Sequence, residues 1–145
     1  MVLAGGCATG PEAGPRRQAS IVKVLPHWLD EEGRHTLSPS LYERDAYQDY
    51  LRNQPERASA LRFDVLWKAP VSGGLTIKVE MRGIRDKQTT LTLLQSQPMA
   101  HEGGREWSSL VLEGESFRSL GQLQAWRASL WSGDLLLEEQ RSFLW

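Results

Sequence analysis

The sequence predicts a mainly β protein, a two-layer β-sandwich of seven strands with one helix in the crossover between the first two strands. Apolar and polar residues alternate with a period of two through most of residues 20–145, as in half-buried strands. Short runs containing Gly, Pro or Asp separate these strands, and only residues 41–52 carry a helical period. A chain of 145 residues with 40% hydrophobic and 24% charged residues suits one globular domain.

The first three strands are predicted over residues 21–25, 61–68 and 75–82. Pro26 is expected to end the first of them, because proline cannot donate to a strand ladder. A turn over residues 70–74, which includes Gly73-Gly74, joins the second and third strands as a hairpin. The residues that alternate inward are Leu61, Phe63, Val65 and Trp67 in the second strand and Leu75, Ile77, Val79 and Met81 in the third.

Four further strands are predicted over residues 89–95, 107–113, 122–131 and 135–143. Leu91 and Leu93 are expected to face inward, and Gly103-Gly104 is expected to be another hairpin turn. Ser132-Gly133-Asp134 joins the last two strands, because a short Gly-Asp link between β-like runs is a strong hairpin signal. Phe143-Leu144-Trp145 is expected to plug the core, where most of the six tryptophans are also expected.

Residues 41–52 form the predicted helix. Ser38-Pro39 suits its start, Ser40 with Glu43 matches a capping box, and Asn53-Gln54-Pro55 ends it. The apolar side comprises Tyr42, Ala46, Tyr47, Tyr50 and Leu51. These positions cover about 180°, whereas packing one face needs little over 100°, so one or two side chains should stay partly exposed. Together with a nearby arginine they predict a partner-binding patch of Tyr42, Arg44, Tyr47 and Leu51.

Seven short strands with regular turns resemble the two-sheet sandwich of immunoglobulin or fibronectin type. The cysteine pair of antibody domains is absent, since the chain has one cysteine. The resemblance is architectural and implies no function.

The single cysteine, Cys7, directly follows the small residues Ala4-Gly5-Gly6, which come after the apolar Leu3. This pattern resembles the end of a bacterial lipoprotein signal peptide, which is cut before a cysteine whose thiol receives a diacylglyceryl group. The sequence departs from the family at Ala4, where a branched aliphatic residue is preferred, and in lacking the charged n-region. The resemblance implies lipidation of Cys7 and a membrane anchor of at least two chains.

Residues 8–19 contain Gly and Pro and almost no apolar side chains, so they are predicted to be a flexible tether. The expected organisation is therefore a truncated lipoprotein signal remnant and tether over residues 1–19 and a sandwich domain over residues 20–145. Ala8 stands where the lipoprotein family uses Asp to retain proteins in the inner membrane. The resemblance thus implies a lipid-anchored protein of the outer membrane that faces the periplasm.

The segment 25–50 also resembles bacterial envelope lipoproteins of uncharacterised function. The resemblance lies in Pro26-His27-Trp28-Leu29-Asp30, Gly33-Arg34-His35 and Ser38-Pro39-Ser40. It implies a location in the envelope and no particular activity.

Several functions are not expected. The near balance of 17 basic and 18 acidic side chains provides no field to attract nucleic acid. His27, His35 and His101 lack metal-ligand spacing, so neither a metal nor another cofactor is expected. No Gly-x-Ser-x-Gly elbow occurs, so no catalytic residue is predicted. Paired carboxylates at Asp30-Glu31-Glu32 or Glu138-Glu139 would need a cleft to act on a glycoside.

The favoured function is therefore non-enzymatic, a binding or assembly accessory with a possible protein partner in the envelope. The alternatives are a small envelope enzyme, for example a carbohydrate-active one, and a purely structural surface protein. The sequence leaves the oligomeric state open.

Overall fold

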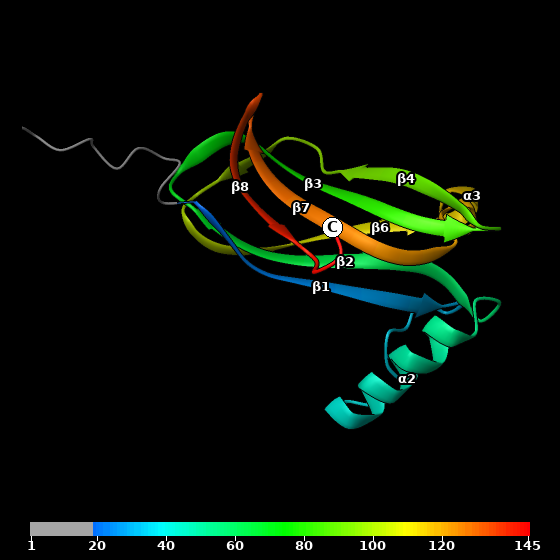
Figure 1. Cartoon of the computed structure of the whole chain (residues 1–145). Coiled ribbons are helices and arrows are strands. Elements are labelled where there is room, and N and C mark those ends of the chain that lie inside the picture. The colour runs from blue at the N-terminus through cyan, green and yellow to red at the C-terminus, as the bar shows by residue number, and fades with distance from the viewer. Residues whose placement is uncertain (1–18) are drawn as a thin grey trace, which may run out of the picture.

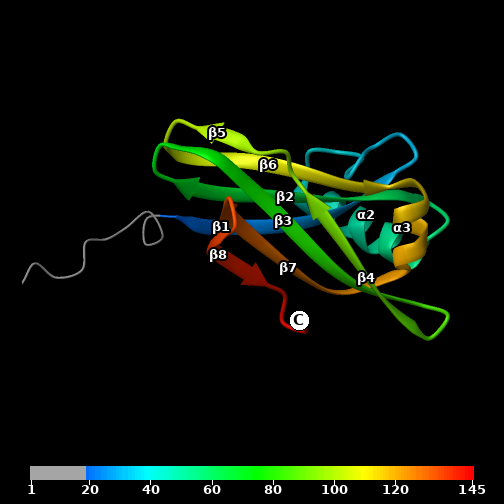
Figure 2. The same cartoon turned by 90° about the horizontal axis from the view of Figure 1, so that it is seen from above.

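A computed structural model describes residues 19–145, which contain eight strands and two helices. The strands form two antiparallel sheets. The elements are β1 (Ser20–Asp30), α2 (Leu41–Asn53), β2 (Ala58–Ala69), β3 (Ser72–Arg85), β4 (Gln88–Gln95), β5 (Met99–His101), β6 (Gly104–Glu113), α3 (Gly114–Leu120), β7 (Gln122–Ser132) and β8 (Leu135–Arg141). One sheet has the order β1-β2-β6, and the other has the order β4-β3-β7-β8 with β5 paired to β3. The sheets pack face to face, and both helices lie at the same end of the sandwich (Figures 1 and 2). The prediction of a mainly β sandwich with a helix between its first two strands is confirmed.

The core lies between the sheets, and the inward faces predicted for β2 and β3 are confirmed. All eight predicted side chains, namely Leu61, Phe63, Val65, Trp67, Leu75, Ile77, Val79 and Met81, are completely buried. Ala128 and Leu130 of β7 close the core from the five-stranded sheet. The buried Trp67 indole donates its N–H to Ser108 Oγ at 2.9 Å, so this ring satisfies its one polar atom inside the sandwich.

Two glycine pairs lie where the chain crosses from one sheet to the other, so the hairpin predictions for them are wrong. Gly73-Gly74 belongs to β3, which pairs with β4, β5 and β7 and not with β2. Gly103-Gly104 lies between β5 and β6, which again belong to different sheets. A Gly-rich turn within a hairpin and one that crosses between sheets have the same local sequence pattern, because long-range pairing decides which sheet the next strand joins. The short β5 and the helix α3 are further elements that the sequence did not predict.

The strand β1 continues through Pro26 as far as Asp30, so Pro26 does not end it as predicted. β1 is an edge strand paired only with β2. The N–H and C=O of Trp28 bond to the side chain of Gln48 in α2 and thus point away from β2. Pro26 lies two residues earlier and shares this orientation, so its missing N–H removes no ladder bond.

Leu91 and Leu93 of β4 face solvent, contrary to the prediction. They are 73% and 53% exposed, and they pair with the outward-facing Arg82 and Glu80 of β3. In the run of Thr and Leu that forms β4 the alternation is ambiguous, and pairing with β3 sets which side faces inward.

The last three residues do not plug the core, so that prediction is also wrong. Phe143 is fully exposed and Leu144 is 64% exposed. The N–H of Trp145 donates to the Ser142 carbonyl in a turn, and the Trp145 ring stacks on Arg82 and Arg127 at 4.5 and 5.0 Å. Both arginines lie on the outer face of the five-stranded sheet, because they are next to the buried Met81 and Ala128, and the turn after β8 brings the Trp145 ring onto this face.

The tryptophans divide between the core and the surface. Trp67 is completely buried, and Trp28 and Trp126 pack partly buried against the core. Trp107 is 52% exposed, and Trp131 lies under the Lys78 ammonium on an outer face. The expectation that most tryptophans fill the core is therefore wrong, because three of the six lie in or against it and three do not.

Candidate functional site

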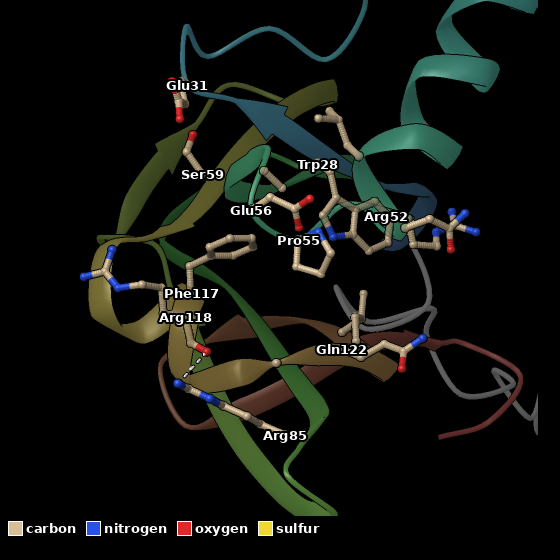
Figure 3. A pocket seen from close by; sticks show the side chains of 15 residues that line it. Trp28, Glu31, Arg52, Pro55, Glu56, Ser59, Arg85, Phe117, Arg118 and Gln122 are labelled. Carbon is tan, nitrogen blue, oxygen red and sulfur yellow. Dashed lines mark hydrogen bonds between the residues drawn. The ribbon is translucent and has the colours of Figure 1, made fainter.

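A pocket of about 770 Å³ opens at the helix-bearing end of the sandwich, and we call it the end pocket (Figure 3). Its walls come from the end of β1, the end of α2 with the following loop, the end of β3, and the junction of α3 with β7. This volume is in the range of small-molecule sites, which are about 300–1,000 Å³. The end pocket therefore has the size to hold a ligand, and it is larger than a second pocket of about 520 Å³ beside Asp30 and Tyr47.

The inner surface of the end pocket is apolar. Trp28 of β1, Phe117 of α3 and Leu123 of β7 line it, and all three also pack against the core. Leu51 of α2 and Pro55 add further apolar surface. A ligand that reached these side chains would remove apolar area from water, which is favourable.

Three arginines line the same pocket. Arg52 of α2 lies over the Trp28 ring with its guanidinium carbon 4.8 Å from the ring centroid. Arg85 of β3 donates to the backbone carbonyl of Arg118 at 3.0 Å, which links β3 to α3. Arg118 itself forms an ion pair with Glu115 on α3. The arginines therefore come from three different elements that the fold brings together.

Two carboxylates complete the lining. Glu31 follows β1, and Glu56 lies in the loop between α2 and β2. Figure 3 shows Glu31 near Ser59, on the other side of the pocket from Arg85. Glu31 and Glu56 therefore lie on the side of the three-stranded sheet, where Arg52 also lies over Trp28, whereas Arg85 and Arg118 lie on the side of β3 and α3.

Two glycines let the wall at α3 approach β3 closely. A Cβ at Gly83 would lie 2.1 Å from the Leu120 carbonyl oxygen, and a Cβ at Gly121 would lie 2.3 Å from the Ile84 carbonyl oxygen. Gly121 also has a φ of +73°, in the left-handed region that favours glycine. Glycine within a strand pattern often marks such a close approach. The sequence analysis did not find Arg85, Phe117 and Arg118, and these glycines are the sequence signal that could have indicated them.

Gln48 attaches α2 to the free edge of β1. Its Oε1 accepts from Trp28 N–H at 2.7 Å, and its Nε2 donates to the carbonyls of Trp28 and His35 at 2.9 and 2.7 Å. The amide thus pairs with Trp28 as another strand would, which protects this part of the edge. The helix that carries Leu51 and Arg52 is positioned against the end pocket by this contact.

Asp30 organises the turn between β1 and α2. One carboxylate oxygen accepts from the N–H groups of Glu32 and Arg34, and the other accepts from the Arg34 side chain and from the Tyr47 hydroxyl at 2.5 Å. Burial acts to raise the pKa of Asp30, but these hydrogen bonds outweigh it and bring the pKa to about 2. Burial, with the bond to Asp30, raises the pKa of Tyr47 to about 12.

The free energy of unfolding should therefore decrease as the pH is lowered and Asp30 becomes protonated. A carboxyl whose pKa is lowered from 3.8 to about 2 contributes stability above pH 3.8 and loses it as pH falls toward 2. We expect the free energy of unfolding to decrease over this window in urea titrations, and to decrease less steeply in Asp30→Asn. Asp64, whose pKa is also lowered to about 2, titrates in the same window, so Asp64→Asn is the matched comparison. Equal slopes in wild type and Asp30→Asn would contradict the role of Asp30.

The four predicted partner-binding residues do not share one surface. Leu51 is buried at the base of α2, where it lines the end pocket. Tyr47 is half-buried by its bond to Asp30, and Arg44 pairs with Asp45. Tyr42 is 83% exposed near the start of the helix, which Ser40 caps as predicted. The packed stripe of α2 contains the polar Gln48, which the apolar pattern did not include.

The histidines lie outside the end pocket. The rings of His27 and His35 lie 5.0 Å apart and tilted by 39° on the outer face of the three-stranded sheet, and His27 contacts the Asp64 carboxylate at 3.1 Å. Burial lowers the pKa of His35, and its neighbours His27 and Arg62 lower it further. His101 is buried, with one ring nitrogen at 2.8 Å from Glu106 and the other at 3.0 Å from the Gly104 carbonyl. No group of three ligand-type side chains within residues 19–145 has metal-binding geometry.

Cys7 and residues 8–18 of the predicted tether lie outside the described residues, so their predictions remain predictions. Ala19, the last residue assigned to the tether, is described and is buried in the core. Neither helix of the described chain is long and apolar enough to span a bilayer. Comparison with protein-family models and with curated proteins found no match.

Proposed function

We propose that this protein is a non-enzymatic binding or assembly accessory of the bacterial cell envelope that recognises its ligand in the end pocket. The observation that carries the proposal is the combination of an apolar floor of Trp28, Phe117 and Leu123 with arginines from three elements. Aromatic and apolar surfaces with a few polar groups are typical of sites that bind small molecules. The location rests on Cys7, whose lipidation would hold the protein to the outer membrane facing the periplasm.

The position of the end pocket supports a tethered binding protein. β1 begins at Ser20 at one end of the sandwich, and the end pocket lies at the other end, beside α2 and α3 (Figure 1). The eleven residues of β1 extend over about 35 Å at roughly 3.3 Å per residue. A chain anchored through residues that precede β1 would present the pocket away from its anchor. A protein partner would then meet the exposed Tyr42 side of α2 at the same end.

The strand order supports an immunoglobulin-like sandwich, which we propose as the finer fold class. The order β1-β2-β6 corresponds to strands A, B and E, and β3-β7-β8 corresponds to C, F and G. β4 extends the second sheet beside β3. This relationship bears on architecture and not on function.

Binding in the end pocket can be tested with a neutral amphiphile. We expect decyl maltoside, below its micelle concentration, to give a saturable shift of the Trp28 indole signal in ¹⁵N NMR spectra of the full chain. Gln122→Phe should weaken this binding, because residue 122 lines the pocket and the ring would fill it. Gln95→Phe, an equal change at the exposed end of β4, should not. If Trp28 responds to no amphiphile of any charge, the end pocket is not a binding site.

Lipidation predicts where the protein resides. When the gene is expressed with a complete lipoprotein signal, we expect the wild-type protein in the membrane fraction, since a diacylglyceryl group and an added acyl chain give stable anchoring. Cys7→Ala should release it into the soluble periplasmic fraction. A membrane fraction that is unchanged by Cys7→Ala would show that the protein is held there by something else.

A small envelope enzyme, for example a carbohydrate-active one, is the second candidate, because Glu31 and Glu56 line the same pocket. Glycoside hydrolysis uses two carboxyl groups that flank the scissile bond. Hydrolysis of envelope glycans that is abolished by Glu56→Gln would favour this alternative over a binding protein.

A further inference from the structure

We propose that the ligand of the end pocket is an amphipathic anion, with its apolar body against Trp28, Phe117 and Leu123 and its anionic head group at Arg85. The proposal rests on the proposed binding function and names the ligand class of that site. It follows from which surfaces of the pocket are apolar, which charges are already neutralised, and on which side each charge lies.

The apolar body is assigned from the floor of the pocket. Trp28, Phe117 and Leu123 each remain partly exposed while they pack on the core, so they offer apolar surface that a ligand can cover. They come from β1, α3 and β7 and therefore line the gap between the ends of the two sheets. A hydrocarbon or aromatic group placed there would extend the core outward.

The anionic head group is assigned from the arginines that have donors to spare. Within residues 19–145, no carboxylate lies within ion-pair distance of Arg52, whose guanidinium rests on Trp28. Arg85 donates one hydrogen bond to the Arg118 carbonyl, and among the described residues its only carboxylate neighbour is the 92% exposed Asp86 at 3.9 Å. A guanidinium has five N–H donors, so both side chains keep free donors for a carboxylate or phosphate.

The contact with the Arg118 carbonyl also orders Arg85 before any ligand arrives. Its guanidinium is held at the α3 side of the pocket at 3.0 Å from that oxygen (Figure 3). An ordered donor loses less conformational entropy on binding than a free surface side chain does. Arg118 is the weaker candidate, because Glu115 already neutralises its charge.

The carboxylates set the orientation of the ligand. Glu31, Glu56 and Arg52 lie toward the three-stranded sheet, whereas Arg85 ends β3 in the other sheet. Of the two arginines with free donors, Arg85 is therefore the one on the side away from the carboxylates. An anionic head group would be repelled from the Glu31 side and attracted to the Arg85 side. The head group of a cationic amphiphile of the same length would be repelled by the arginine at this place.

Four probes with one decyl chain and different head groups test the ligand class. These are decanoate, decyl phosphate, decyl maltoside and decyltrimethylammonium, titrated into the full chain below their micelle concentrations with the Trp28 indole shift as the readout. We expect one or both anionic probes to bind about tenfold or more tightly than the neutral one, as a charge-assisted hydrogen bond allows. The cationic probe should bind most weakly. Preference between decanoate and decyl phosphate distinguishes a fatty acid from a phospholipid-type head group.

Two arginine variants assign the head group. Arg85→Gln should reduce the preference for the anionic over the neutral probe, while the affinity for decyl maltoside stays within about twofold. Arg52→Gln, on the side of the carboxylates, should reduce this preference less. Arg105→Gln removes the same charge from the exposed start of β6, at the other end of the sandwich, and should leave the preference unchanged.

The outcomes separate this inference from the function on which it rests. Neutral or cationic probes that bind at Trp28 as tightly as the anionic ones would overturn the amphipathic anion and leave the pocket as a binding site. A preference for anions that survives Arg85→Gln, or that Arg52→Gln reduces more than Arg85→Gln does, would overturn the assignment of the head group. No response of Trp28 to any of the four probes would overturn the binding function itself.

Discussion

Gly121→Ala is expected to destabilise the protein more than a change of one methyl group suggests, by about 3 to 4 kcal/mol. A non-glycine residue in the left-handed region costs roughly 1–2 kcal/mol, and forcing atoms into a packed site costs roughly 1–3 kcal/mol more. Both terms apply, because Gly121 has a φ of +73° and its Cβ would lie 2.3 Å from the Ile84 carbonyl oxygen. The backbone atoms it meets cannot rotate away as a flexible side chain can. Urea denaturation measures the loss.

Gly133→Ala provides the matched control for this prediction. Gly133 also has a positive φ, of +57°, but no atom lies within 4 Å of its added Cβ. The free energy of unfolding of Gly133→Ala should therefore decrease only by the conformational cost of about 1 kcal/mol. Equal losses in the two variants would show that α3 and β3 can separate without cost. Because Ile84 and Arg85 are adjacent, Gly121→Ala should also weaken ligand binding in the end pocket.

Gln48→Ala is expected to detach α2 from β1 and to lower the free energy of unfolding by about 2 to 3 kcal/mol. The substitution leaves three backbone groups without partners, namely the N–H and C=O of Trp28 and the C=O of His35. An unsatisfied buried polar group costs roughly 1–3 kcal/mol, less where water can reach it. The effect should be local first, since α2 lies beside the sandwich and not within it. Hydrogen exchange at the Trp28 amide and along α2 should therefore accelerate more than exchange in β3.

Two variants control for this prediction. Gln48→Glu keeps the acceptor for Trp28 N–H but loses the two donated bonds, so its exchange rates should lie between those of wild type and Gln48→Ala. Asp49→Ala changes the neighbouring, exposed position and should leave the Trp28 amide as protected as in the wild type. A Trp28 amide that exchanges equally slowly in Gln48→Ala would mean that α2 is held by its apolar contacts alone.

Strong local patterns predicted those parts of the fold that depend on neighbouring residues. The inward faces of β2 and β3 were correct because large apolar residues alternate there with charged ones. The helix was correct within a residue at its end, because Ser40 and Glu43 form a recognisable start. In β4, where Leu and Thr alternate, the pattern does not show which side of the strand faces inward. That side could not be assigned before the pairing with β3 was known.

The candidate site shows the same division. The helix pattern pointed to Tyr42, Arg44, Tyr47 and Leu51 as one patch, yet only Leu51 lines the end pocket. Arg52, Arg85 and Arg118 are far apart along the chain, and no local motif joins them. Their meeting depends on α3 closing against β3 at Gly83 and Gly121, which places the end of one sheet beside a helix at the end of the other.

The sequence by itself determined that the chain forms a β-sandwich, which residues of β2 and β3 fill it, and where its longer helix begins. Period and capping depend on residues a few positions apart, so they can be read along the chain. Only the tertiary structure decided which sheet each strand joins after a glycine-rich turn, which side of β4 is exposed, and that Trp145 lies on Arg82 and Arg127. These outcomes are set by pairing and packing between distant segments. The end pocket is of this second kind, because its apolar floor and its arginines come from strands and helices that meet only when both sheets have formed.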